Sequence, residues 1–126
     1  MEVLRLTLRI VIIGSGRLAK AIVQALTSNG FHPNQFIIIM RPGSDASWFS
    51  GFNFMISDNF SDINDFNPTH ICIAVDPDGA GYVLHGLQGI SLNPLGRYRI
   101  ISFVPGLKAG HISNTIKGIH NRPVIA

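Results

Sequence analysis

The chain has 126 residues, of which 46% are apolar and 13% are charged, and its formal net charge at pH 7 is +3. This length suits one domain with a shared core and is too short for a binding domain followed by a full catalytic domain. The basic residues are scattered, without the run of Lys and Arg that follows a phosphate backbone, so we do not expect nucleic acid as a partner. The large apolar fraction predicts exposed apolar surface.

The apolar segments argue against a membrane protein. None approaches the roughly 20 residues that cross a bilayer. Arg5 and Arg9 interrupt the N-terminal stretch where a signal peptide would be apolar, so we expect a cytoplasmic protein with no membrane partner. The single cysteine, Cys72, lies in the apolar run 71–75, where a thiol packs as a small buried hydrophobe.

The first elements in chain order are a strand, a glycine turn and a helix. Residues 8–13 form a β-branched apolar run without alternation, which is typical of a strand covered on both faces. Gly14 and Gly16 interrupt this run. Apolar residues then recur at helical spacing over residues 18–26, until Asn29 and Gly30 end the pattern.

The rest of the chain continues to alternate between strand and helix patterns. We expect further strands at 36–40, 54–57, 69–75, 99–104 and 123–126. We expect helices at 45–49, where only about a turn fits, at 61–66 with Ser61 as its cap, after Pro77 through residue 87, and near 111–116.

This alternation predicts an α/β fold with a doubly wound, mainly parallel sheet and helices on both faces. We expect a single domain over residues 1–126. The chain stops within its last apolar run, so we expect either a fragment or an edge strand at that end.

The most informative motif is residues 14–19, Gly-Ser-Gly-Arg-Leu-Ala, which match the G-x-G-x-x-A variant of the dinucleotide fingerprint between a strand and a helix. The first glycine permits a tight turn, the second lets a pyrophosphate approach the backbone, and Ala19 lets the helix pack closely on the sheet. The phosphates then meet the positive end of a helix dipole. The alternative is a plain glycine turn. We predict a Rossmann-type domain whose dinucleotide contacts come from Gly14, Ser15, Gly16, Arg17 and Leu18.

The end of the second predicted strand favours NADP over NAD. An acidic residue at this point would accept hydrogen bonds from a ribose 2′-hydroxyl and repel a 2′-phosphate. The residues present are Met40, Arg41, Pro42, Gly43 and Ser44, and a guanidinium with a hydroxyl suits a 2′-phosphate. The alternative is that Arg41 is an ordinary solvated loop residue.

Over nearly its whole length the chain resembles the N-terminal NADP-binding domain of pyrroline-5-carboxylate reductases and related F420-dependent NADP oxidoreductases. The matching segments stand in the family's order, namely its glycine turn at 14–19, its phosphate site at Met40, Arg41 and Ser44, its Thr-Asp-Asn segment at 57–59, its Ala-Val-Lys-Pro segment at 74–77 and its Ala-Gly loop at 105–106. Asp76 replaces the lysine of the fourth segment.

The resemblance implies NADP(H) as cofactor, with Asn59, Ala74 and Val75 among its contacts. It also implies hydride transfer to a cyclic imine or related substrate, with the nicotinamide over Val75, Asp76 and Pro105. For Asn59 the alternative is a helix-capping side chain.

The resemblance also bears on what this domain does alone. Reductases of this family carry a helical C-terminal domain that forms the dimer and completes the substrate pocket, and this chain ends before it. We therefore expect a domain that is incomplete for catalysis alone and relies on a homo-oligomer or on a partner supplying the missing domain. The alternative is a non-catalytic Rossmann module that binds a nucleotide or a protein partner.

Other chemistry-bearing groups give weaker signals. The histidines show no zinc-type pairing, so we expect no metal, and no catalytic residue can be assigned. Asp76 and Asp78 are either paired carboxylates or, more commonly, helix-capping acids. The aromatic residues of segment 48–54 either pack in the core, which we favour, or stack on adenine or nucleic-acid bases.

Overall fold

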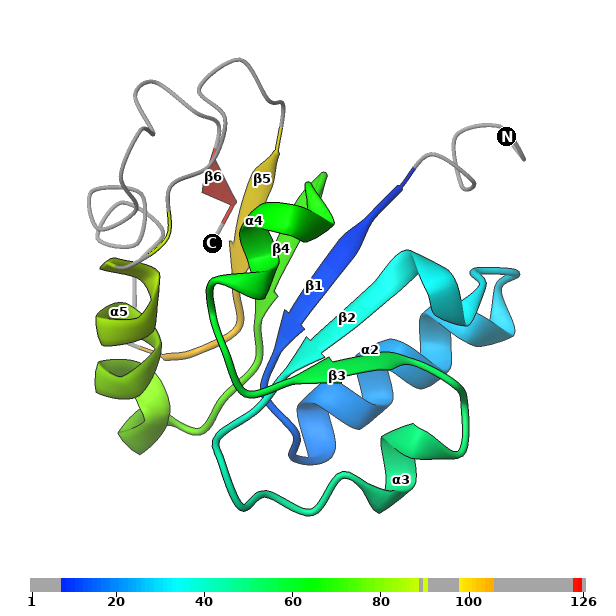
Figure 1. The fold of residues 1–126 in the computed structure, drawn as a ribbon, viewed down its shortest axis with the longest axis horizontal. Coiled ribbons are helices and arrows are strands. Elements are labelled where there is room, and N and C mark those ends of the chain that lie inside the picture. Colours follow the sequence, from blue (N-terminus) through cyan, green and yellow to red (C-terminus); the bar gives the residue numbers. More distant parts are fainter. Residues whose placement is uncertain (1–7, 89, 91–97, 106–123, 126) are drawn as a thin grey trace.

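The computed structural model describes residues 8–88, 90 and 98–105, and the backbone of 124–125. These residues form a six-stranded sheet in the order β3-β2-β1-β4-β5-β6, in which every neighbouring pair is parallel (Figure 1). Its strands are β1 (Ile10–Ile13), β2 (Phe36–Ile39), β3 (Met55–Ser57), β4 (His70–Ile73), β5 (Arg99–Ser102) and β6 (Val124–Ile125).

Helices cover both faces of this sheet, as the doubly wound prediction requires. The α-helices of the described residues are α2 (Arg17–Ser28), α3 (Ser47–Ser50), α4 (Asp62–Phe66) and α5 (Ala80–Gln88). Two short 3₁₀ helices, η1 (Pro33–Gln35) and η2 (Pro77–Gly79), precede β2 and α5.

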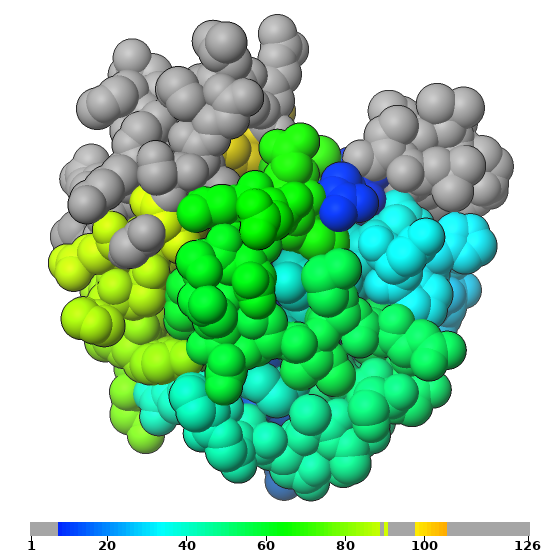
Figure 2. Space-filling view, in the orientation of Figure 1, coloured from blue at the N-terminus to red at the C-terminus, as the bar shows by residue number. Residues whose placement is uncertain are grey.

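Alternate residues of the central strands pack against different helices, which divides the core into two layers. Ile10 and Ile12 of β1 belong to a cluster with Ala19 and Val23 of α2 and with residues of α3. Their neighbours Val11 and Ile13 belong to a second cluster with residues of α4 and α5. All of β1 is therefore buried, and little of it is visible between the segments that flank it in Figure 2. This two-sided burial explains why the strand sequence is apolar without alternation.

Most predicted elements are present with shorter bounds. The predicted 8–13 strand begins at Ile10, and the predicted 69–75 strand is reduced to four residues. The helix at 45–49 is the single turn α3, as expected. The C-terminal strand is present as β6 at the edge of the sheet, whereas the predicted helix near 111–116 lies outside the described residues.

The prediction that the Ser61 side chain caps the helix over 61–66 is wrong. Ser61 occupies the N-cap position of α4, but its side chain makes no capping hydrogen bond. Its hydroxyl donates to Oδ1 of Asn59 at 2.9 Å, and its backbone N–H donates to the same atom at 3.0 Å. An asparagine two residues earlier therefore organises this helix start.

The chain order reverses direction across the sheet between β1 and β4. From β1 the chain builds outward through β2 and β3, and from β4 it builds the other way through β5 and β6. The loops after β1 and β4 consequently leave the sheet on opposite faces and open a crevice at its carboxyl edge. Ligands of doubly wound sheets bind at this place.

Candidate functional site

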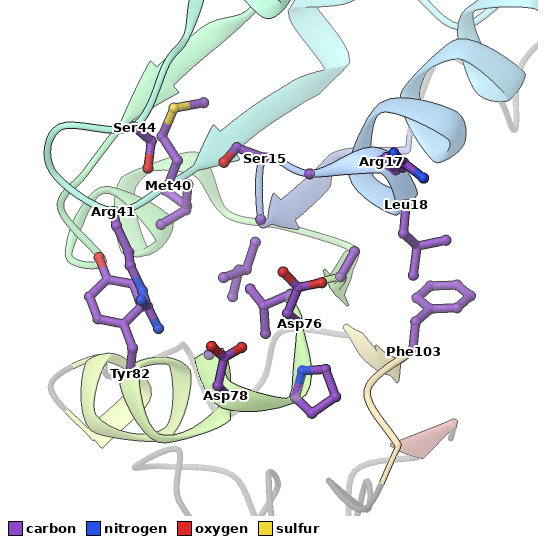
Figure 3. A pocket seen from close by; sticks show the side chains of 18 of the residues that line it. Ser15, Arg17, Leu18, Met40, Arg41, Ser44, Asp76, Asp78, Tyr82 and Phe103 are labelled. Atoms are coloured by element: carbon purple, nitrogen blue, oxygen red, sulfur yellow. The ribbon is translucent and has the colours of Figure 1, made fainter.

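A cavity of about 440 Å³ occupies this crevice (Figure 3). All but one of the predicted cofactor contacts line it, the exception being Asn59. Its walls come from residues 13–18, 39–41 and 74–79, together with Ser44, Tyr82, Phe103 and Pro105.

Gly14 is required by the backbone of this site. It has a φ of +136°, a conformation that L side chains rarely adopt, and its N–H donates to the Ile39 carbonyl at 2.8 Å. A Cβ at Gly14 would overlap the carbonyl oxygen of Ala74. The turn after β1 is therefore held tightly between the ends of β2 and β4, where only glycine fits.

Gly16 has a different role, because its φ of −86° is open to any residue. A Cβ at Gly16 would meet no other atom within 4 Å, so the space above its backbone is open. Gly16 is also the N-cap of α2, where no side chain caps the helix and no acid occupies the first turn. Unpaired N–H groups and an open approach are the features by which a helix start accepts a phosphate, so the residues present fit a dinucleotide.

Arg41 and Ser44 stand in the loop after β2 and line the same cavity. A turn closed by the Ser44 N–H and the Arg41 carbonyl, at 3.1 Å, keeps the two residues together. Arg41 is exposed, yet its side chain is not simply surrounded by water, because its Cζ lies 4.9 Å from the ring centroid of Tyr82 on α5 (Figure 3). A cation therefore borders one end of the cavity.

Two carboxylates lie near the middle of the cavity. Asp76 and Asp78 both line it, between the Arg41 end and the opposite end (Figure 3). Asp76 is the N-cap of η2 but makes no side-chain capping hydrogen bond, so the capping alternative is wrong for this residue. Where the family pattern has a lysine, this cavity carries negative charge.

The end of the cavity opposite Arg41 is apolar. Leu18 on α2 and Phe103 after β5 are 41% and 43% exposed, and their side chains point toward one another there (Figure 3). Leu18 and Phe103 are among the exposed apolar residues that the composition predicted. Phe103 and Tyr82 were not predicted as site residues. The predicted strand 99–104 included Phe103, so its position directly after a parallel strand, where ligands bind, became visible only because β5 ends at Ser102.

Asn59 lies apart from the other predicted contacts. It lines a neighbouring hollow of about 410 Å³ that shares Met40, Arg41 and Ser44 with the first cavity. Its side-chain oxygen accepts the two hydrogen bonds from Ser61, the N-cap residue of α4, so Asn59 stabilises the start of this helix, close to the helix-capping role given as its alternative. Its contact with a cofactor stays a prediction.

The remaining sequence expectations concern the aromatic segment, metals and membranes. Phe49 and Phe54 are buried in the α2 side of the core, and no residue of 48–54 lines the cavity. Among the described residues, no three His, Cys, Asp or Glu side chains gather as metal ligands would. Within the same part of the chain, no helix has the length and apolar character needed to span a membrane.

No protein-family model matches the chain, and no curated protein matches it either. Solved structures do match. A pyrroline-5-carboxylate reductase from Coxiella burnetii aligns with a TM-score of 0.71 and 23% identity, over 87% of this chain and 40% of the reductase. A 1-pyrroline-5-carboxylate reductase from Streptococcus pyogenes aligns with a TM-score of 0.66 and 18% identity, over 92% of this chain and 40% of the reductase. The chain thus has the α/β fold of part of these enzymes and spans less than half of their length, which confirms the predicted Rossmann-type fold and its likeness to this family.

Proposed function

We propose that this chain binds NADP(H), as the nucleotide-binding part of a pyrroline-5-carboxylate reductase-like oxidoreductase that transfers hydride to a cyclic imine or a related substrate. One observation carries the proposal. The uncapped glycine turn and the loop of Arg41 and Ser44 open into one cavity at the switch point of the sheet, with no acid at the end of β2.

The roles of the residues follow from their places in the cavity. The backbone from Gly14 to Leu18 binds the pyrophosphate at the start of α2. Arg41 and Ser44 bind the 2′-phosphate, with the guanidinium as a planar, permanently charged donor. Ala74 and Val75, after β4, support the other half of the dinucleotide. The nicotinamide supplies the hydride when it is bound, and the protein supplies position.

The test is a calorimetric titration of the purified chain with NADPH and with NADH. We expect tighter binding of NADPH. Arg41→Ala should remove most of this preference, since hydrogen bonds to charged groups contribute about 1.5–3 kcal/mol, roughly 10- to 150-fold in affinity. Gly16→Val should abolish binding of both nucleotides, because the side chain fills the open space over the turn.

Arg99→Ala is the matched control, since Arg99 is exposed at the start of β5 and does not line the cavity. It should leave both affinities unchanged. Binding of neither nucleotide by the wild-type chain would refute the proposal. Equal effects of Arg41→Ala on NADPH and NADH would refute the assignment of the 2′-phosphate to Arg41.

A second candidate function is nucleotide binding without hydride transfer. Asp76 favours it, because a carboxylate stands on the cavity wall where the family pattern has a lysine. A chain that binds NADPH but oxidises none with cyclic imines, even when assembled as a homo-oligomer or with a partner that supplies a further domain, would support this candidate. Turnover under those conditions would reject it.

A further inference from the structure

We propose that Tyr82 is a positioning residue that sets the preference of this cavity for NADPH over NADH, by holding the Arg41 guanidinium at the cavity wall. The inference rests on the proposed function. It concerns a residue of α5, far from the glycine turn and from the loop after β2 in sequence.

Neighbours on two elements, α5 and η2, define the position of the Arg41 side chain. Its Cζ lies 4.9 Å from the ring centroid of Tyr82, within the range of an attractive cation–π interaction. On the adjacent η2, the Cβ position of Gly79 lies 3.4 Å from Arg41 Nη2, an ordinary contact distance, so the guanidinium lies beside η2. The side chain of Arg41 therefore reaches from the end of β2 to η2 and α5.

The ring of Tyr82 also contacts a residue of the core. Phe60 packs edge-on against it, with ring centroids 5.4 Å apart and an interplanar angle of 72°. Phe60 is buried in the α5 side of the core. Phe60 contacts Tyr82 and Tyr82 contacts Arg41, so the three side chains form a chain of contacts from the core to the cavity wall.

The Arg41 side chain has a competing position outside this cavity. It also lines the neighbouring hollow, where Asp58 and Asp62 are the acidic residues. Burial raises the pKa of Tyr82, the charge of Arg41 lowers it and the charge of Asp58 raises it further, so both charges act on the same phenol. Without the ring, the carboxylate of Asp58 would draw a long, exposed guanidinium out of the cavity.

This arrangement affects the two nucleotides differently. A 2′-phosphate requires the guanidinium in the cavity, and a side chain already held there loses less conformational freedom on binding. NADH carries no 2′-phosphate and makes no use of Arg41. Tyr82 should therefore change the affinity for NADPH and leave the affinity for NADH nearly unaltered.

The experiment compares dissociation constants for NADPH and NADH in Tyr82→Leu, Tyr82→Phe and the wild-type chain. We expect Tyr82→Leu to lower the NADPH to NADH preference about two- to fivefold, the size of an exposed cation–π interaction. Tyr82→Phe keeps the ring face and should retain the preference. Adding Asp58→Asn to Tyr82→Leu should restore part of it, because the competing charge is gone.

Several results would overturn the inference. An unchanged preference in Tyr82→Leu would do so, as would an equal loss of both nucleotides, which a merely structural role produces. A loss in Tyr82→Phe as large as that in Tyr82→Leu would also count against it. If Tyr82→Leu fails to fold, Tyr82→Gln tests the same loss of the ring. Failure of the wild-type chain to bind either nucleotide would refute the proposed function itself, whereas wild-type NADPH binding with no effect of Tyr82 refutes this inference alone.

Discussion

The backbone of Gly14 lies against the carbonyl group of Ala74, so closely that no Cβ fits between them. These two residues are 60 positions apart in the sequence and follow the adjacent parallel strands β1 and β4. Their contact joins the glycine turn to the far wall of the cavity. It makes Gly14 a structural residue and separates its role from that of Gly16.

Gly14→Ala should destabilise the fold. The new methyl group would overlap the Ala74 carbonyl, and a φ of +136° is strained for alanine. Backbone strain alone costs about 1–3 kcal/mol, and the overlap adds to it. A fall in the thermal unfolding midpoint, followed by circular dichroism, would measure the effect.

Gly16→Ala is the matched comparison, since a Cβ there meets nothing and the φ of −86° suits alanine. Its unfolding midpoint should stay near that of the wild type while nucleotide binding weakens. Equal destabilisation by the two substitutions would contradict the distinction between a glycine needed for the turn and one needed for ligand access.

Two glycines of helix α5 should respond to alanine with opposite sign. Gly81→Ala adds a methyl group to open space and should stabilise the protein by about 0.5–1 kcal/mol, the usual gain of alanine over glycine in a helix. Gly86→Ala should destabilise it, because a Cβ there would lie 2.5 Å from the ring of Phe60. Chemical denaturation of both variants tests the pair, and stabilisation by both would show that Phe60 moves aside freely.

Asp76→Asn should tighten NADPH binding by about two- to fivefold, the scale of an exposed charge interaction of ~0.5–1 kcal/mol. The carboxylate lines the cavity and opposes the phosphates of the ligand. The gain should be smaller for NADP⁺, whose nicotinamide is cationic, and it should shrink as salt is added. Asp65 is exposed on α4 and lines neither hollow, so Asp65→Asn should leave the affinity for NADPH unchanged. Weaker NADPH binding in Asp76→Asn would contradict the electrostatic interpretation.

Burial of Cys72 in β4 raises the pKa of its thiol from 9.0 to about 11. The folded chain should therefore resist alkylation at pH 8, and the rate of labelling should follow unfolding, because the thiolate is the nucleophile. The unfolded thiol loses its proton first as the pH rises above 9, so this group makes the folded state less stable between pH 9 and about 11. Cys72→Ala should remove that part of the decline in denaturation curves measured across this range. Rapid labelling of the native chain would show that the thiol is accessible.

Local patterns in the sequence determined the order of the elements and the position of the glycine turn. Buried β-branched runs, helical spacing of apolar residues and glycines between them act over a few neighbours, so residues 10–39 fold much as predicted. The predicted strand ends were too long, because apolar residues such as Met40 continue past the last residue paired in the sheet.

Only the tertiary structure decided which side chains share the cavity. Arg41 contacts Tyr82, and the side chains of Leu18 and Phe103 point toward one another, because the strand order β2-β1-β4-β5 brings the ends of four strands to one edge of the sheet. The resemblance grouped Asn59 with the cofactor contacts; in the structure its side-chain oxygen accepts hydrogen bonds from Ser61 beside the neighbouring hollow, and its contact with a cofactor stays a prediction. The sequence determines local conformation through neighbouring residues, whereas these contacts depend on the register and packing of strands 26 to 60 residues apart, which no local pattern encodes.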